Sequence, residues 1–151
     1  MAFEPDIVVT GPEPSEIALV VEVKMSSRTV DDSAGRLKSY MAAVRSPVGL
    51  LVTPERLRIY RDRYLPSLED SIAKVGEFDV KDILHFDTTG NATADALAFE
   101  RHVQSWLEAL STEAGVRELS PEIKRAVERY IVPALAQGSV RSGHPRSAIS
   151  S

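Results

Sequence analysis

The chain has 151 residues, a hydrophobic fraction of 43%, a charged fraction of 26% and a net charge of −4. These values fit one globular domain and exclude a largely disordered or collagen-like chain. No apolar run approaches the roughly 20 residues that a transmembrane helix needs, and the first residues lack the basic head and apolar stretch of a secretory signal. There is no cysteine, which excludes disulfides, thiol nucleophiles and thiolate metal sites. We therefore expect a cytoplasmic protein without a membrane segment.

Charge is distributed unevenly along the chain. Acids exceed Lys and Arg in residues 1–24 and again in residues 65–151, whereas residues 25–64 contain eight Lys or Arg against four acids. An acidic region beside a basic one suits a metal site next to a phosphate-binding surface, although scattered solvated charges would give the same balance.

Two short apolar segments near the beginning predict a β-hairpin. Residues 6–9 are β-branched and strand-sized, and residues 10–15 contain Gly and Pro, which interrupt a strand. Residues 17–23 are almost continuously Val, Leu and Ile, which is typical of a central strand buried on both faces.

A helix, a buried strand and a basic strand are predicted next. Asp31, Asp32 and Ser33 can each cap a helix, and an apolar stripe at spacings of three and four follows, at Ala34, Leu37, Met41 and Val44. The helix should stop at Ser46-Pro47, and residues 48–52 are expected to form a buried strand. Residues 57–64 alternate weakly and are expected to form an exposed edge strand. The arginines at positions 56, 58, 61 and 63 would protect that edge or follow a DNA backbone.

The second half of the chain predicts two further helices and a tail. Within residues 65–94, the sequence pattern predicts only a short strand or turn, between positions 77 and 86. An amphipathic helix follows at about 95–111, and Ser120-Pro121 opens a second one, which Pro133 should kink and Gly138 should end. We expect a single domain over residues 1–138, with these helices at about 95–137, and a flexible tail over residues 139–151.

Pro5-Asp6 and Glu22-Val23-Lys24 form the pattern most informative about function. Because side chains alternate along a strand, Glu22 and Lys24 point to the same side, and in a hairpin Asp6 can lie beside Glu22. Burying an unpaired charge within this apolar run would cost several kcal/mol, at least about 3. An ion pair between Glu22 and Lys24 at the strand end is the alternative to a catalytic site.

This pattern resembles the PD-(D/E)xK superfamily of nucleases, also called restriction-endonuclease-like, over residues 4–64. The matching features are Pro5-Asp6, Glu22-Val23-Lys24 and the order strand, strand, helix, strand. The segments 22–27 and 36–41 also look like the N-terminal nuclease domain of type I restriction subunits. The resemblance implies a three-layer α/β/α fold with a mixed central sheet, here with two additional C-terminal helices.

In that family, the residues at the positions of Asp6 and Glu22 hold a divalent ion, usually Mg²⁺ with Mn²⁺ as a substitute, together with the main-chain carbonyl at the position of Val23. The resemblance implies that Lys24 orients or deprotonates the attacking water. Such a set agrees with phosphodiester hydrolysis, which needs a hard cation and a water placed in line, and Mg²⁺ requires few carboxylates.

Some members also have Gln-x-x-x-Tyr on the next helix, which contacts the substrate or the site. The same spacing here has Arg36 in place of the glutamine and retains Tyr40. Arg36 could bind a phosphate, and Tyr40 could either contact substrate or flank the apolar stripe of its helix.

The family usually has a helix, often bearing a glutamate, before the PD motif, whereas only residues 1–4 precede it here. The helix at 95–111, with Glu100 and Gln104, could replace it or could merely cover the sheet. A partner subunit could also supply the missing helix, or the chain could be a degenerate remnant of the family. A homodimer would give such a small chain a second active site.

The sequence thus predicts a Mg²⁺-dependent nuclease acting on nucleic acid, DNA rather than RNA, through Asp6, Glu22 and Lys24. The alternative is a catalytically inactive nuclease-fold module that binds nucleic acid or a protein partner. A third interpretation is a structural α/β domain whose charges form ion pairs.

Overall fold

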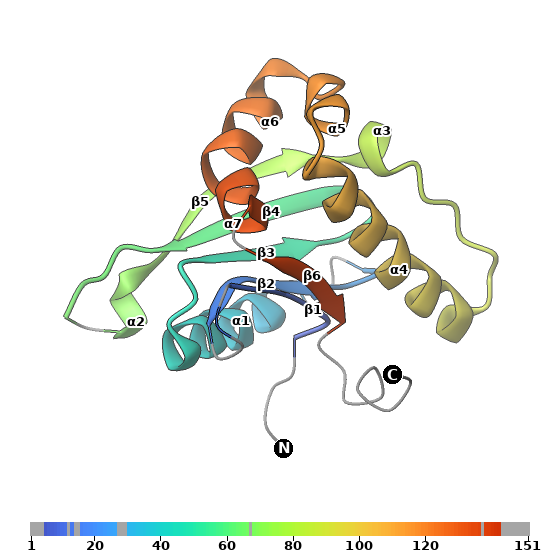
Figure 1. Cartoon of the computed structure of the whole chain (residues 1–151). Helices are drawn as coiled ribbons and strands as arrows, with labels where there is room; N and C mark the ends of the chain where they lie inside the picture. Colours follow the sequence, from blue (N-terminus) through green and yellow to red (C-terminus); the bar gives the residue numbers. More distant parts are fainter. Residues whose placement is uncertain are drawn as a thin grey trace.

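A computed structural model of the chain describes residues 5–11, 13, 16–26, 30–66, 68–136 and 138–142. The strands are β1 (Ile7–Thr10), β2 (Ile17–Val23), β3 (Val48–Val52), β4 (Arg56–Asp62), β5 (Ile72–Asp79) and β6 (Ser139–Ser142). The helices are α1 (Val30–Val44), α2 (Leu68–Ser71), α3 (Lys81–Leu84), α4 (Ala92–Leu110), α5 (Glu113–Arg117), α6 (Pro121–Ala126), the π-helical turn η2 (Val127–Ile131) and α7 (Val132–Ala136). α1 and α2 lie between the first five strands, and a mostly helical segment that ends in β6 follows (Figure 1).

The strands form one mixed sheet in the order β5-β4-β3-β2-β1-β6. β2 and β3 are parallel and are connected through α1, whereas the other neighbouring strands are antiparallel. The predicted hairpin of the first two strands is confirmed, with Ile7 opposite Val21. The fold is therefore α/β with a six-stranded mixed sheet, as the sequence indicates.

Helices cover both faces of the sheet (Figure 1). On one face, α1 packs its predicted stripe, including Leu37 and Met41, against Val20 of β2 and Leu51 of β3. On the other face, α4 and the helices after it bury a larger apolar cluster around Leu50 of β3. We call these two sides the α1 face and the α4 face.

Helix boundaries follow local signals in the sequence. The side chain of Asn91 accepts a hydrogen bond from the amide of Ala94 at the start of α4, 3.1 Å away. Ser120 precedes α6, whose first residue is Pro121. Pro133 lacks the N–H that an α-helix needs, and the widened turn η2 directly precedes it. The predicted kink thus takes the form of a π-helical turn.

Two predicted features are wrong. β4 is not an edge strand, because it pairs with β3 on one side and with β5 on the other. Residues Ser139–Ser142, predicted as the beginning of a flexible tail, form β6 instead, antiparallel to β1. Val140 of this strand packs against the core, and main-chain pairing, which leaves little trace in an apolar pattern, joins the strand to β1. The remainder of the predicted tail lies outside the described residues.

None of the described helices combines the length and the apolarity that crossing a bilayer requires.

Candidate active site

Asp6 and Glu22 lie opposite each other at one end of the β1–β2 ladder. The amide of Asp6 donates to the carbonyl of Val21, 3.1 Å away, so main-chain bonding to β2 begins one residue before β1. The carboxylate of Asp6 accepts a hydrogen bond from the amide of Val23 at 2.7 Å. Asp6 is thus fixed by the strand that also carries Glu22, as the hairpin prediction required.

Glu22 is buried, with only 4% of its surface exposed. Burial raises its pKa to about 9, and a hydrogen bond and charge repulsion from Asp6 act in the same direction. The positive charges of Lys24 and Arg36 oppose this shift. Without a cation, Glu22 therefore holds a proton at neutral pH and shares the site with the Asp6 carboxyl group.

Lys24 directly follows β2 and continues its pairing with β3. Its amide donates to the carbonyl of Val52 at 2.9 Å, and the residue is half-buried. Strand alternation directs its side chain to the α1 face, the same face as Glu22. Because its charge acts on the pKa of Glu22, the structure brings Asp6, Glu22 and Lys24 together.

Val23 presents its main-chain polar groups to Asp6. In a strand, the N–H and C=O of one residue point to the same side, and the N–H of Val23 is bonded to Asp6. Its carbonyl therefore faces the side of Asp6, away from β3.

The donors at this end of the sheet fit a hard divalent cation. Two carboxylates and one carbonyl are oxygen ligands, and Mg²⁺ usually binds one or two carboxylates while keeping several waters. Among the described residues, no group of three or more His, Asp or Glu side chains could hold a metal, so the two acids are not supplemented by a third one. This donor set fits Mg²⁺ and contains none of the Cys or His ligands that typical zinc sites include.

Arg36 and Tyr40 lie one turn apart on α1 but in different surroundings. Arg36 is exposed, its Nη2 donates to the hydroxyl of Ser33 at 3.3 Å, and its charge lowers the pKa of Glu22. Tyr40 is half-buried and packs against the apolar cluster of the α1 face. Arg36 thus lies on the side of the acidic pair, and Tyr40 contributes to the packing of the α1 face.

The helix considered as a replacement for the missing first helix covers the other side of the sheet. α4 contributes Phe99, Val103 and Leu107 to the cluster of the α4 face, while Glu22 and Lys24 point to the α1 face. The interpretation of this helix as a cover for the sheet is therefore the one that its packing favours.

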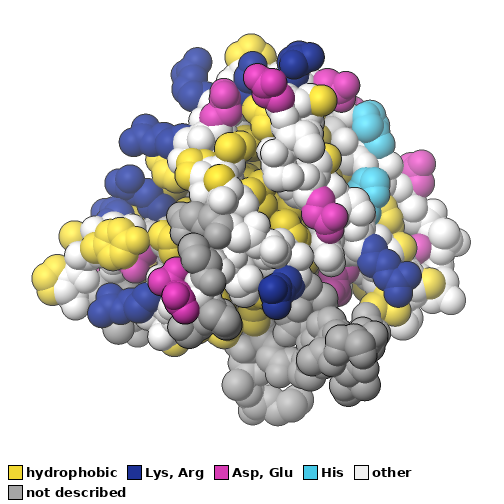
Figure 2. Space-filling model, viewed as in Figure 1, with side chains coloured by type: hydrophobic (Ala, Val, Ile, Leu, Met, Phe, Trp, Pro, Cys, Tyr) yellow, Lys and Arg dark blue, Asp and Glu magenta, His cyan; other side chains and the backbone are white. Residues whose placement is uncertain are grey.

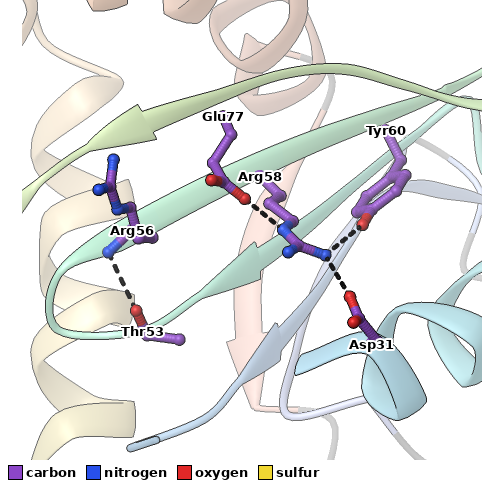
Figure 3. A network of polar contacts seen from close by, with 6 residues as sticks. All are labelled: Asp31, Thr53, Arg56, Arg58, Tyr60 and Glu77. Carbon is purple, nitrogen blue, oxygen red and sulfur yellow. Dashed lines mark hydrogen bonds and ion pairs between the residues drawn. The ribbon is translucent and has the colours of Figure 1, made fainter. Parts of the chain in front are cut away.

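Sequence reasoning missed a polar network that lies in the same row of the sheet as Glu22. The register pairs Glu22 with Leu51, Leu51 with Arg58, and Arg58 with Glu77. Nε of Arg58 donates to Oε1 of Glu77 at 2.5 Å, and Nη1 lies 3.3 Å from Asp31 (Figure 3). The alternation of Arg56 and Arg58 was visible in the sequence, but their distance from Glu22 depended on the order of the strands.

The ion pairs of Arg58 alter the pKa values of the groups concerned. Hydrogen bonding to Tyr60 raises the pKa of Arg58 above its usual value, and the bond from Arg58 lowers the pKa of Glu77. Both groups are therefore charged at any physiological pH.

A cavity of about 210 Å³ lies beside this network. Val30 and Leu51 form apolar walls, and Thr53, Arg56, Arg58 and Glu77 supply polar groups. Because Leu51 is the strand neighbour of Glu22, this cavity begins one strand away from the acidic pair.

No family model, curated protein or solved structure matches this chain.

Proposed function

We propose that the chain is a Mg²⁺-dependent nuclease of the restriction-endonuclease-like type, with Asp6, Glu22 and Lys24 as its catalytic residues. The observation that carries the proposal is the pair Asp6 and Glu22, two facing carboxyl groups at the end of a buried sheet with a lysine beside them. A structural ion pair needs one acid for one base, whereas a second acid directed at the first is costly unless one of the two holds a proton or a cation binds there.

Each residue of the site has a separate role in the proposed reaction. Asp6, Glu22 and the carbonyl of Val23 would hold the ion, and the bond from the Val23 amide fixes the Asp6 carboxylate. The ammonium group of Lys24 would orient the attacking water and offset negative charge at the phosphorus. Arg36, on the same side as the pair, would bind a phosphate oxygen of the substrate.

Mg²⁺ bound at this position would polarise a phosphoryl oxygen and lower the pKa of a bound water.

Nucleic acid is the substrate that the surface favours. Lys and Arg side chains lie along the upper left margin of the surface, interspersed with Asp and Glu (Figure 2). Arg56 and Arg58 of β4 line the cavity on the α1 face. Basic side chains along a face bind the phosphate backbone without regard to sequence. We propose DNA as the polymer, and a homodimer as the form that would present two sites.

Metal titration combined with a cleavage screen tests the proposal. Mg²⁺ and Mn²⁺ are titrated calorimetrically into the wild type, Asp6→Asn and Glu22→Gln, and circular dichroism verifies that each variant is folded. Supercoiled plasmid, linear duplex DNA, single-stranded DNA and RNA are then incubated with Mg²⁺ or EDTA. Lys24→Met is the matched control, since it removes the charge but keeps both acids.

We expect saturable metal binding in the wild type and its loss in both acid variants. Lys24→Met should bind metal but cleave at least about 100-fold more slowly, the range typical of a positioned acid–base group. Metal binding and nucleic-acid binding without cleavage would favour the alternative of an inactive nuclease-fold module. Absence of metal binding in all variants would contradict the proposal.

A further inference from the structure

We propose that the cavity beside Arg58 binds a second phosphate group of the same nucleic-acid strand, next to the phosphate that is cleaved. This inference rests on the proposed function for the identity of its ligand, but its argument uses residues outside the catalytic set. It assigns Arg58 and Arg56 as substrate-binding residues.

The first argument is the alignment of the two sites. Glu22, Leu51 and Arg58 occupy one row across β2, β3 and β4. Adjacent strands are about 4.8 Å apart, so Arg58 lies about 10 Å from Glu22 along the sheet. Both residues are on the α1 face, because Leu51 between them packs against α1. Because α1 covers Leu51, a bound nucleic-acid strand would not lie on this row itself. It would follow the end of the sheet, where Thr53, Arg56 and Arg58 line the cavity.

The second argument is the way in which Arg58 is held. Its Nε is bonded to Glu77, and its Nη1 is within 3.5 Å of the Tyr60 hydroxyl (Figure 3). No bond from Nη2 is found among the described residues. The guanidinium is thus fixed at one edge and retains donors for a ligand, which is the arrangement that phosphate recognition by arginine requires.

The third argument is that the remaining partner of Arg58 can be replaced. Asp31 lies 3.3 Å from Nη1, but its side chain is 96% exposed. Ion pairs with such exposed groups contribute little, commonly less than about 1 kcal/mol. A phosphate could therefore take the place of Asp31 on Arg58 while Glu77 keeps the guanidinium in position.

Arg56 provides a second cation at the cavity. Its amide donates to the hydroxyl of Thr53 at 3.0 Å, which fixes the main chain, while its guanidinium points away from Thr53 (Figure 3). The register continues from Lys24 to Thr53 and Arg56, since Lys24 bonds to Val52 and Thr53 bonds to Arg56. A second row of the sheet thus connects the proposed catalytic lysine to this cavity.

Substitutions of Asp31 and of the two arginines should change the affinity for nucleic acid in opposite directions. If a phosphate displaces Asp31, removing the negative charge should strengthen binding, whereas removing Arg58 or Arg56 should weaken it. If the network is purely structural, Asp31→Asn should not bind the nucleic acid more tightly than the wild type. The probe is a fluorescein-labelled 12-nucleotide single strand, followed by anisotropy in EDTA at several salt concentrations, so that cleavage does not interfere.

We expect Arg58→Gln and Arg56→Gln to weaken binding about 10-fold and to reduce the slope of log K against log salt by about 1. Asp31→Asn should bind more tightly, by at least about twofold. Arg125→Gln, an exposed residue of α6, is the matched control and should match the wild type.

Unchanged affinity and salt slope in both arginine variants would overturn the inference, as would a wild type that does not bind the probe. The proposed function is tested separately by metal binding and cleavage. Arginine-dependent binding in a protein that never cleaves would support the phosphate site and contradict the nuclease. If cleavage is lost in Glu22→Gln but probe binding does not depend on Arg58 and Arg56, the nuclease is supported and the phosphate site is contradicted.

Discussion

The carboxyl groups of Asp6 and Glu22 face each other across the β1–β2 ladder, where burial and the neighbouring Asp6 raise the pKa of Glu22 to about 9. Two ionised carboxylates would repel each other in this buried position, so protonation of one of them stabilises the fold. A divalent cation would have the same effect with the proton removed. The pair would therefore link folding and pH to the proposed metal binding.

The first prediction concerns stability and pH in EDTA. Burial and the neighbouring Asp6 raise the pKa of Glu22 to about 9 in the folded chain, from the ordinary value of 4.5 that we take for the unfolded chain. Between these values the folded state holds a proton that the unfolded state has released. The contribution of Glu22 is therefore fully present below pH 4.5 and is lost as pH rises toward 9, with a slope of at most about 1.4 kcal/mol per pH unit.

Urea denaturation of the wild type and Glu22→Gln between pH 5 and 9 measures this effect. Glutamine cannot ionise, so the variant should become more stable than the wild type as pH rises. A difference in unfolding free energy that is the same at every pH would contradict the predicted protonation of Glu22.

The second prediction concerns protons released by Mg²⁺. Because a carboxylate ligand must be ionised, metal binding at pH 7 should expel the proton of Glu22. Calorimetric titrations in buffers of different ionisation enthalpy should show release of up to about one proton per bound ion, together with affinity that increases with pH. Heats that do not depend on the buffer would mean that Glu22 is not a ligand or is already ionised.

The sequence predicts the part of the fold that local signals determine. Breakers at residues 10–15 separate two apolar runs, so the hairpin and the position of Asp6 opposite Glu22 follow from alternation alone. The stripe containing Leu37 and Met41 likewise predicts α1.

Features that depend on strand order could not be obtained in this way. β5 is half-exposed and contains Lys74 and Glu77, so its residues alternate without an apolar run. Without β5, the basic strand β4 has the composition of an edge strand. The row that joins Glu22 to Arg58 exists only once three strands have been placed side by side.

The third prediction concerns Arg36, whose positive charge lowers the pKa of Glu22. Arg36→Gln should therefore raise the midpoint at which Glu22 titrates, above the value in the wild type. Carbon-13 NMR of the glutamate side-chain carboxyl carbons, assigned with Glu22→Gln, measures this midpoint. Tyr40→Phe, one turn further along α1, leaves all charges unchanged and should titrate like the wild type. Equal midpoints in Arg36→Gln and the wild type would place the arginine away from the acidic pair.

The fourth prediction concerns two glycines with opposite surroundings. A Cβ on Gly138 would overlap the main-chain oxygen of Thr10, at the place where β6 joins β1. Gly138→Ala should therefore lower the free energy of unfolding by about 1–3 kcal/mol and speed amide hydrogen exchange in β1. Gly35, in the middle of α1, has no atom within 4 Å of such a Cβ. Gly35→Ala should instead stabilise the protein by about 0.5–1 kcal/mol, because alanine favours the helix.

Chemical denaturation of both variants, at a pH where Glu22 is protonated in each, separates packing from titration. Because β1 carries Asp6 next to its first residue, Gly138→Ala should also weaken Mg²⁺ binding, whereas Gly35→Ala should leave it unchanged. If Gly138→Ala keeps the stability and the metal affinity of the wild type, then β6 does not hold β1 in place. The geometry of the acidic pair would in that case depend on β2 alone.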